Sequence, residues 1–221
     1  MADRVRALVF DLDGTLVDSR GDIVASCNFA LTSAGRDPLS ADEISSFVGN
    51  GARSLVARAF RIPASAPEVA GHLDCFLSYY ATHPADHTAA LPGAQEALRL
   101  SEHYQLGLCT NKARSTTLGL LGALGWLDAF GSIVAGGDTD ELKPHPAPLL
   151  RACHELSVAP GEVWMIGDGP QDIGAAKAAG AIAVAVLGGF AADESLRNAG
   201  PDHVIPSLDQ LPKLLQRVTR S

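Results

Sequence analysis

Short runs of consecutive apolar residues recur along the chain, and stretches with helical periodicity separate them. The runs cover residues 5–10, 106–110, 133–135, 163–166 and 182–187, with a last, shorter one at 204–205. Uninterrupted apolar runs of this length are typical of parallel strands that are covered on both faces. The pattern therefore predicts an α/β fold with a doubly wound, mostly parallel sheet.

One long segment, from about residue 19 to residue 80, shows helical patterns only. An apolar stripe ends at Gly35, a capping box of Ser40 and Glu43 starts a second helix, and another begins near Ala52. We expect the second helix to stop at residues 49–51, which contain two glycines. Apolar residues at helical spacing mark the first and the last helix of the segment: Ile23, Cys27, Ala30, Leu31 and Ala34, then Val69, Leu73, Phe76 and Tyr80.

This helical segment divides the chain into two units. We expect a small all-helical domain at residues 16–87, inserted into an α/β core made of residues 1–15 and 88–221. The 221 residues, 47% of them hydrophobic, suffice for a substantial core. The four cysteines are widely spaced and form no C-x-x-C pair, which favours reduced thiols in a cytoplasmic protein.

Charge and hydropathy argue against two classes of partner. The formal net charge is −8 at pH 7 and no basic run occurs, whereas nucleic acid and anionic lipid require clustered Lys and Arg. The longest uncharged stretch, residues 178–192, is shorter than the roughly 20 residues of a membrane span. The first residues lack the apolar segment of a signal peptide. We expect no nucleic-acid or membrane partner, while a small anion needs only a local positive pocket.

Polar residues follow several predicted strands at their carboxyl ends, where ligands of open α/β sheets bind. Asp11 and Asp13 follow the first strand, and two carboxylates so close repel each other unless a cation or a shared proton relieves them. Taken alone, this pair is as readily explained by a turn with solvated aspartates. Further clusters at the same edge suit a hard, oxygen-preferring cation and a phosphoryl group: Thr110, Asn111 and Lys112; Lys143; Asp168 and Asp172.

With these motifs in this order, the sequence resembles the haloacid dehalogenase superfamily, and within it the phosphoglycolate phosphatase-like group. The resemblance covers essentially the whole chain, and the set of motifs is far more specific than any one of them. It implies a Rossmann-like core, a helical cap domain and a phosphatase. It also implies a small phosphorylated metabolite as the substrate, with a monomer and a homodimer both left open.

The resemblance implies a role for each residue of the reacting site. Asp11 becomes the nucleophile that attacks phosphorus, and Asp13 becomes the acid that protonates the leaving oxygen and then activates water. Thr110 and Asn111 are expected to hydrogen-bond the phosphoryl group. Lys143 is expected to neutralise its charge and that of Asp11.

It further implies Mg²⁺ as the cofactor. Its expected ligands are the carboxylates of Asp11 and Asp168 and the backbone carbonyl of Asp13. Asp172 is expected to act from further out, by ordering water or Lys143. A carboxylate favoured by a helix N-terminus is the simpler alternative for Asp172.

Other members of the superfamily fit these residues less well. A dehalogenase would not be expected to keep an acid at Asp13, because no ester oxygen needs a proton. Sugar-phosphate mutases usually have Glu-Asp where Gly167 and Asp168 stand. A phosphonatase would need a Schiff-base lysine in the inserted domain, but the lysines of this chain all lie outside it: Lys112, Lys143, Lys177 and Lys213. A sugar-phosphate phosphatase and an inactive scaffold protein remain alternatives.

The inserted domain suggests a substrate. Residues 47–53 resemble the cap loop of phosphoglycolate phosphatases, so Asn50, Gly51 and Arg53 are expected to contact the substrate. Arg53 could pair bidentately with a carboxylate, as 2-phosphoglycolate would require. A solvated arginine at the start of a helix is the plainer explanation.

Overall fold

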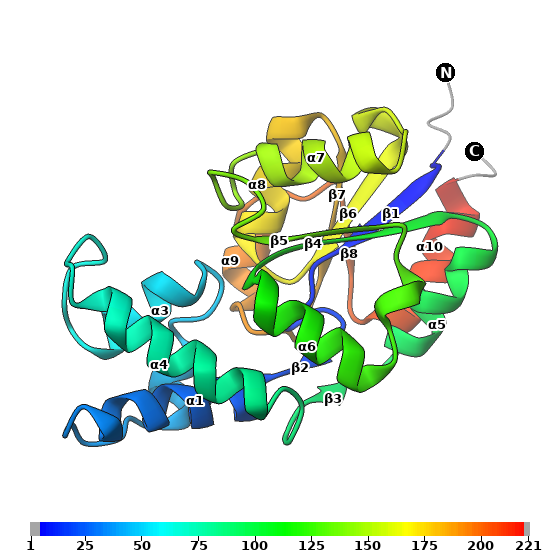
Figure 1. Cartoon of the computed structure of the whole chain (residues 1–221). Coiled ribbons are helices and arrows are strands. Elements are labelled where there is room, and N and C mark those ends of the chain that lie inside the picture. Colours follow the sequence, from blue (N-terminus) through cyan, green and yellow to red (C-terminus); the bar gives the residue numbers. More distant parts are fainter. Residues whose placement is uncertain (1–4, 219–221) are drawn as a thin grey trace.

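In the computed structural model, which describes residues 5–218, six parallel strands form one sheet. The strand order is β5-β4-β1-β6-β7-β8, and all six expected strands are present (Figure 1). The α/β class with a mostly parallel sheet is therefore confirmed. The strands are β1 (Ala7–Phe10), β4 (Gln105–Ala113), β5 (Ser132–Gly136), β6 (Val163–Gly167), β7 (Ile182–Val186) and β8 (His203–Ile205).

Helices cover both faces of the sheet, which explains the uninterrupted apolar runs of its strands. Successive residues of β1 point to opposite faces, so Leu8 and Phe10 join one buried cluster while Ala7 and Val9 join the other. Residues of α5 (Ala94–Arg99), α6 (Arg114–Leu124) and α10 (Leu211–Val218) complete the first cluster. The second cluster is completed by α7 (Ala147–Glu155), α8 (Pro170–Ala179) and α9 (Asp193–Asn198). Short 3-10 helices at Leu100–Glu102, Leu127–Ala129, Pro160–Glu162 and Leu208–Gln210 connect these elements.

Four helices between the first and second strands of the sheet form a separate unit, here called the cap. They are α1 (Arg20–Ser33), α2 (Ala41–Ser45), α3 (Ala52–Ala59) and α4 (Val69–Thr82), and they enclose a hydrophobic cluster of their own (Figure 1). The backbone N–H of Glu43 donates to Ser40 Oγ at 3.2 Å, which is half of the expected capping box. Helix α2 ends at Ser45, earlier than expected, because the chain turns before it reaches residues 49–51.

Two very short strands join the cap to the core. Strands β2 (Val17–Asp18) and β3 (Ala89–Ala90) pair in antiparallel fashion, so both connections leave the core side by side. Next to them, the buried carboxylate of Asp22 accepts hydrogen bonds from the backbone N–H of His87 at 2.9 Å and from Thr88 Oγ1 at 2.5 Å. Asp22 thus ties the first cap helix to the returning connection.

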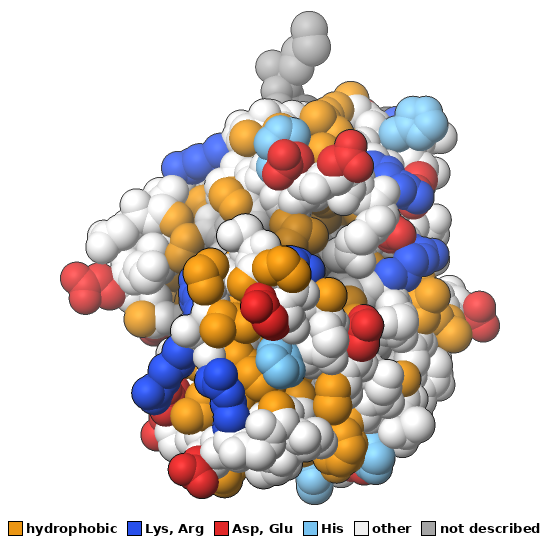
Figure 2. Space-filling view, turned by 60° about the vertical axis from the view of Figure 1, so that its left-hand side comes forward, with side chains coloured by type: hydrophobic (Ala, Val, Ile, Leu, Met, Phe, Trp, Pro, Cys, Tyr) orange, Lys and Arg blue, Asp and Glu red, His pale blue; other side chains and the backbone are white. Residues whose placement is uncertain are grey.

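The strand order places the functional region at the end of β1. Strands β4 and β5 extend the sheet on one side of β1, and β6, β7 and β8 extend it on the other. Ligands of such sheets bind where the order reverses, beyond the carboxyl ends of the strands. On the face shown in Figure 2, basic and acidic side chains are interspersed. Within residues 5–218, no helix is both long and apolar enough to cross a bilayer.

Candidate active site

A cavity of about 480 Å³ lies between the cap and the carboxyl ends of the strands. Turns after β1 and β6, the end of β4 and the 49–51 loop of the cap contribute to its walls. The cavity brings together every residue expected at the site except Arg53. These residues are Asp11, Asp13, Asn50, Gly51, Thr110, Asn111, Lys143, Asp168 and Asp172.

Asp11 and Lys143 lie side by side in the wall of the cavity. Lys143 Nζ lies 2.9 Å from Asp11 Oδ1 and 2.6 Å from Asp172 Oδ1, and it donates to the carbonyl of Cys109 at 2.6 Å. Burial opposes the positive charge of Lys143, but the two carboxylates outweigh it, so the pKa of the ammonium is raised. The contact with Asp11 lacks hydrogen-bond geometry, and Asp11 Oδ1 is a buried oxygen that accepts no hydrogen bond from the described residues.

Three carboxylates converge beside this oxygen. Oxygens of Asp11, Asp168 and Asp172 lie within 4.8 Å of one another. Burial and the charge of Asp11 raise the pKa of Asp168 to about 6, even though Thr15 Oγ1 and the N–H of Phe190 donate to its carboxylate at 2.8 and 2.6 Å. This all-oxygen set, with one oxygen lacking a hydrogen bond, fits a hard divalent cation such as Mg²⁺.

Asp172 is committed to other contacts. It pairs with Lys143, and its second oxygen accepts the backbone N–H of Gly169 at 2.9 Å. Burial raises the pKa of Asp172 against the opposing effect of Lys143. The contact with Lys143 agrees with one of the two roles expected for Asp172, which stays a prediction.

Asp13 has a different set of partners. Lys112 Nζ lies 3.1 Å from its Oδ1 and 3.2 Å from its Oδ2, and Ser19 Oγ donates to Oδ1 at 2.5 Å. Lys112 also donates to the hydroxyl of Tyr80, on cap helix α4, at 2.7 Å. From the sequence, Lys112 was grouped with Thr110 and Asn111 as a possible donor to a phosphoryl group, and not as a partner of Asp13. Ser19 and Tyr80 were given no role in the site.

Asn111 connects the core to the cap. Its amide donates to the carbonyls of Gly49 and Lys143, both at 2.9 Å, and its oxygen accepts the N–H of Lys143 at 2.8 Å. A second contact of this kind joins Gln171 Nε2 to Asn50 Oδ1 at 3.4 Å. The 49–51 loop of the cap is thereby held over the carboxyl ends of β4 and β6.

A comparison with protein families shows to which family the chain belongs. Residues 8–186 match the family model described as haloacid dehalogenase-like hydrolase, which covers both the cap and the site. The chain belongs to the haloacid dehalogenase-like hydrolase family. It is therefore a hydrolase, and it resembles the phosphoglycolate phosphatases.

Relatives of this hydrolase match it over nearly its full length. A protein from Chromobacterium violaceum named phosphoglycolate phosphatase is 39% identical over 96% of this chain and 97% of its own length. A crystal structure of a predicted phosphoglycolate phosphatase from Haemophilus somnus 129pt has a TM-score of 0.86 at 27% identity and covers 96% and 98% of the two chains. The structure of CbbY from Rhodobacter sphaeroides in complex with phosphate has a TM-score of 0.81 at 25% identity, covering 94% and 96%.

The two arginines of helix α3 occupy different places in this hydrolase. Arg53 is exposed and does not line the cavity; its Nε donates to the carbonyl of Ala64 within the cap at 2.9 Å. Arg58, which the sequence analysis did not single out, does line the cavity. Among residues 5–218, no carboxylate lies within ion-pair distance of Arg58, whereas Lys112 and Lys143 are both paired. Arg58 is thus the cationic side chain of the cavity that is left for a ligand.

Cys109 is a core residue of this hydrolase despite its place beside Thr110. Its side chain is fully buried, and burial raises the pKa of the thiol to about 12. The thiolate required of a nucleophile is therefore scarce at neutral pH.

Proposed function

We propose that this hydrolase is a magnesium-dependent phosphatase that forms an aspartyl phosphate on Asp11, with 2-phosphoglycolate as its substrate and glycolate and phosphate as products. The observation that carries the reaction class is Asp11 itself. It follows the central strand, faces the cavity and keeps one buried oxygen that accepts no hydrogen bond from the described residues. The ammonium of Lys143 lies 2.9 Å from this oxygen, so the carboxylate is held in one orientation at the cavity for attack on phosphorus.

In the first step, a carboxylate oxygen of Asp11 attacks phosphorus while the ester P–O bond breaks. Asp13 gives its proton to the leaving oxygen, so glycolate departs with a hydroxyl group. Lys143, 2.9 Å from Asp11, offsets the negative charge of the transferring phosphoryl group. Thr110 lines the cavity beside it and supplies a hydroxyl donor. Both amide hydrogens of Asn111 are taken by the carbonyls of Gly49 and Lys143, so its side chain holds these two segments in place and does not donate to the phosphoryl group here, contrary to the expectation from the sequence.

In the second step, Asp13 acts as a base. As a carboxylate it takes a proton from a water molecule, whose oxygen attacks phosphorus and breaks the bond to Asp11. Phosphate leaves, the Asp11 carboxylate is restored and Asp13 is protonated for the next cycle. One acidic pair therefore serves both steps.

The carboxylates of Asp11 and Asp168 and the backbone carbonyl of Asp13 would hold Mg²⁺. The ion, when bound, offsets charge on the phosphoryl oxygens and on the nucleophile. Asp172 contributes by orienting Lys143 at 2.6 Å, and not as a ligand.

Two observations support 2-phosphoglycolate as the substrate. The Chromobacterium violaceum relative bears the name phosphoglycolate phosphatase, and Arg58 is a cation of the cavity wall with no ion pair among the described residues. A guanidinium pairs well with a carboxylate, which phosphoglycolate carries and simple alkyl phosphates lack. The cavity volume of about 480 Å³ also admits a larger ester, so a sugar phosphate is the second candidate.

The substrate assignment is tested by comparing the two arginines of α3. Replacing Arg58 by Ala removes the free cation, so kcat/KM for phosphoglycolate should fall by about 10- to 150-fold, the scale of a lost hydrogen bond to a charged group. Ethyl phosphate, which has no carboxylate, should lose less than about threefold. Arg53→Ala is the matched control, because Arg53 lies on the same helix but outside the cavity.

Three results would contradict this assignment. Equal losses on both substrates would give Arg58 a structural role in the cap. A selective loss in Arg53→Ala instead would restore the original expectation for Arg53. A wild-type enzyme that prefers a sugar phosphate in a panel of monoesters, ranked by kcat/KM, would favour the second candidate.

A further inference from the structure

Lys112 is a buried lysine whose ammonium group lies between the core and the cap. Its side chain is only 5% exposed, and Nζ contacts both oxygens of Asp13, at 3.1 and 3.2 Å. On the other side, Nζ donates to the hydroxyl of Tyr80 at 2.7 Å and lies 4.3 Å from the centre of its ring. Tyr80 belongs to cap helix α4 and is 1% exposed.

Burial of this ammonium is costly unless its partners compensate for it. Desolvation disfavours the charge, but Asp13 and Tyr80 outweigh it, so the pKa of Lys112 is raised and the side chain stays charged. Asp13 is in turn fixed on both oxygens by Lys112 and on Oδ1 by Ser19, which donates at 2.5 Å. Tyr80 therefore holds Lys112 from the cap, and Lys112 in turn restricts the carboxylate of Asp13.

We propose that Lys112 and Tyr80 are positioning residues for Asp13: the ammonium orients its carboxyl group toward the leaving oxygen, and the Tyr80 hydroxyl holds the ammonium from the cap. This inference rests on the proposed role of Asp13 as the acid, but not on the identity of the substrate. Because Tyr80 is part of the cap, the alignment of Asp13 depends on the cap lying where it does here.

If Lys112 positions Asp13, substrates with poor leaving groups should depend on Lys112 more than substrates with good ones. When Asp13 donates its proton, a carboxylate forms next to Lys112 and is stabilised by it. Ethyl phosphate needs this proton because ethoxide is a poor leaving group, whereas 4-nitrophenolate departs readily without one. The value of kcat/KM reports the steps up to departure of the leaving group. It therefore reports on Asp13 as the acid and not on its later role as the base.

The experiment compares Lys112→Met and Tyr80→Phe with the wild-type enzyme on ethyl phosphate and on 4-nitrophenyl phosphate. For Lys112→Met, kcat/KM should fall by about 100-fold on ethyl phosphate and by no more than about fivefold on 4-nitrophenyl phosphate. Tyr80→Phe removes only the hydroxyl, so its loss on ethyl phosphate should be smaller, about 3- to 10-fold, with the same preference. Tyr80→Phe keeps the inference testable if Lys112→Met does not fold.

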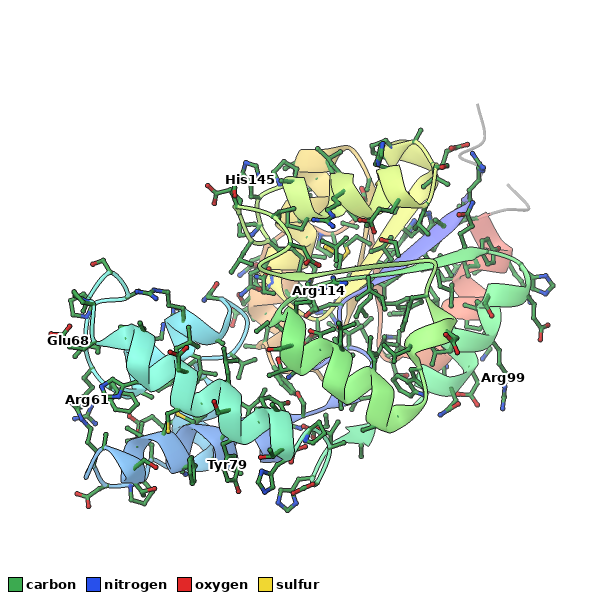
Figure 3. All side chains as sticks on the ribbon, viewed as in Figure 1. Arg61, Glu68, Tyr79, Arg99, Arg114 and His145 are labelled. Carbon is green, nitrogen blue, oxygen red and sulfur yellow. The ribbon has the colours of Figure 1, made fainter. Side chains whose placement is uncertain are left out.

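Matched controls lie nearby in the chain. Tyr79, labelled in Figure 3, is the preceding residue of α4. It stacks on Phe29 of α1 at 4.4 Å between ring centres and does not line the cavity. Lys177 is an exposed lysine of α8 that donates to the carbonyl of Ala199. Tyr79→Phe and Lys177→Met should retain wild-type values on both substrates.

The outcomes separate this inference from the proposed function. Equal losses of Lys112→Met on the two substrates would overturn the positioning role and leave Lys112 a structural residue. A Tyr80→Phe enzyme indistinguishable from Tyr79→Phe would overturn the connection to the cap. A wild-type enzyme that hydrolyses neither ester nor 2-phosphoglycolate in the presence of Mg²⁺ would instead overturn the proposed phosphatase reaction.

Discussion

At the scale of single residues, the site depends on a small number of charges that compensate one another. Lys143 is shared between Asp11 and Asp172, and Lys112 is held by Asp13. Removing one partner of such a buried pair leaves the other uncompensated. Substitutions that preserve shape therefore give clearer information about chemistry here than truncations do.

Asp11→Asn is such a substitution. It keeps the side-chain volume but removes the carboxylate that forms the bond to phosphorus, so turnover should fall below about a hundredth of the wild-type value. Phosphate release from saturating substrate measures it, with Asp128→Asn, an exposed aspartate distant in sequence, as the control. A folded Asp11→Asn enzyme that keeps a tenth or more of wild-type turnover would exclude covalent catalysis by Asp11, because that activity is at least ten times the expected value.

The sequence predicted the cavity residues that follow strands better than those that the cap contributes. Asp11, Asp13 and Asp168 follow strands, and parallel strands bring their carboxyl ends to one edge whatever the details of packing. The position of Arg58 depends instead on how helix α3 is rotated against the core. A correct helix start at Ala52 does not reveal that rotation, which is why Arg53 was chosen and Arg58 was not.

At the scale of elements, the paired connections β2 and β3 determine how the cap is attached. Each has only two residues, so neither produces the periodicity by which a strand is recognised in a sequence. The buried Asp22 was likewise not foreseen, because its partners at His87 and Thr88 are more than 60 residues away. Only the fold brings these residues together.

Asp22→Ala tests the attachment of the cap. The substitution leaves the N–H of His87 and the hydroxyl of Thr88 without their acceptor, so the free energy of unfolding should fall by about 1 to 3 kcal/mol. Urea denaturation measures this change. Asp74→Ala, at an exposed position of helix α4, should lower the free energy of unfolding by less than about 0.5 kcal/mol. Similar values for the two variants would mean that Asp22 contributes nothing special to the connection.

At the scale of the whole molecule, the cap and the core meet through residues of the site itself. Asn111 donates to the carbonyl of Gly49, and Lys112 donates to Tyr80, so the groups that face the substrate also hold the cap in place. Ligands that order this region should therefore stabilise the complete fold. The three converging carboxylates make a divalent cation the first such ligand to examine.

Magnesium should raise the thermal unfolding midpoint, because it relieves the repulsion between these carboxylates and binds the folded chain only. At a concentration 100 times its Kd, a ligand of the folded state contributes about 2.7 kcal/mol. For a chain of this size that corresponds to an increase of about 5 to 10 °C over the value in chelator. Asp168→Asn should lose most of this increase, since it removes a proposed ligand, whereas Asp128→Asn should keep it.

The same titration followed by phosphate release should show activity abolished in chelator and restored by Mg²⁺. Ca²⁺ should raise the midpoint but support little turnover, because its longer bonds and larger coordination shell misplace the nucleophile. An unchanged wild-type midpoint, or full turnover in excess chelator after dialysis, would show that the carboxylate cluster functions without a metal.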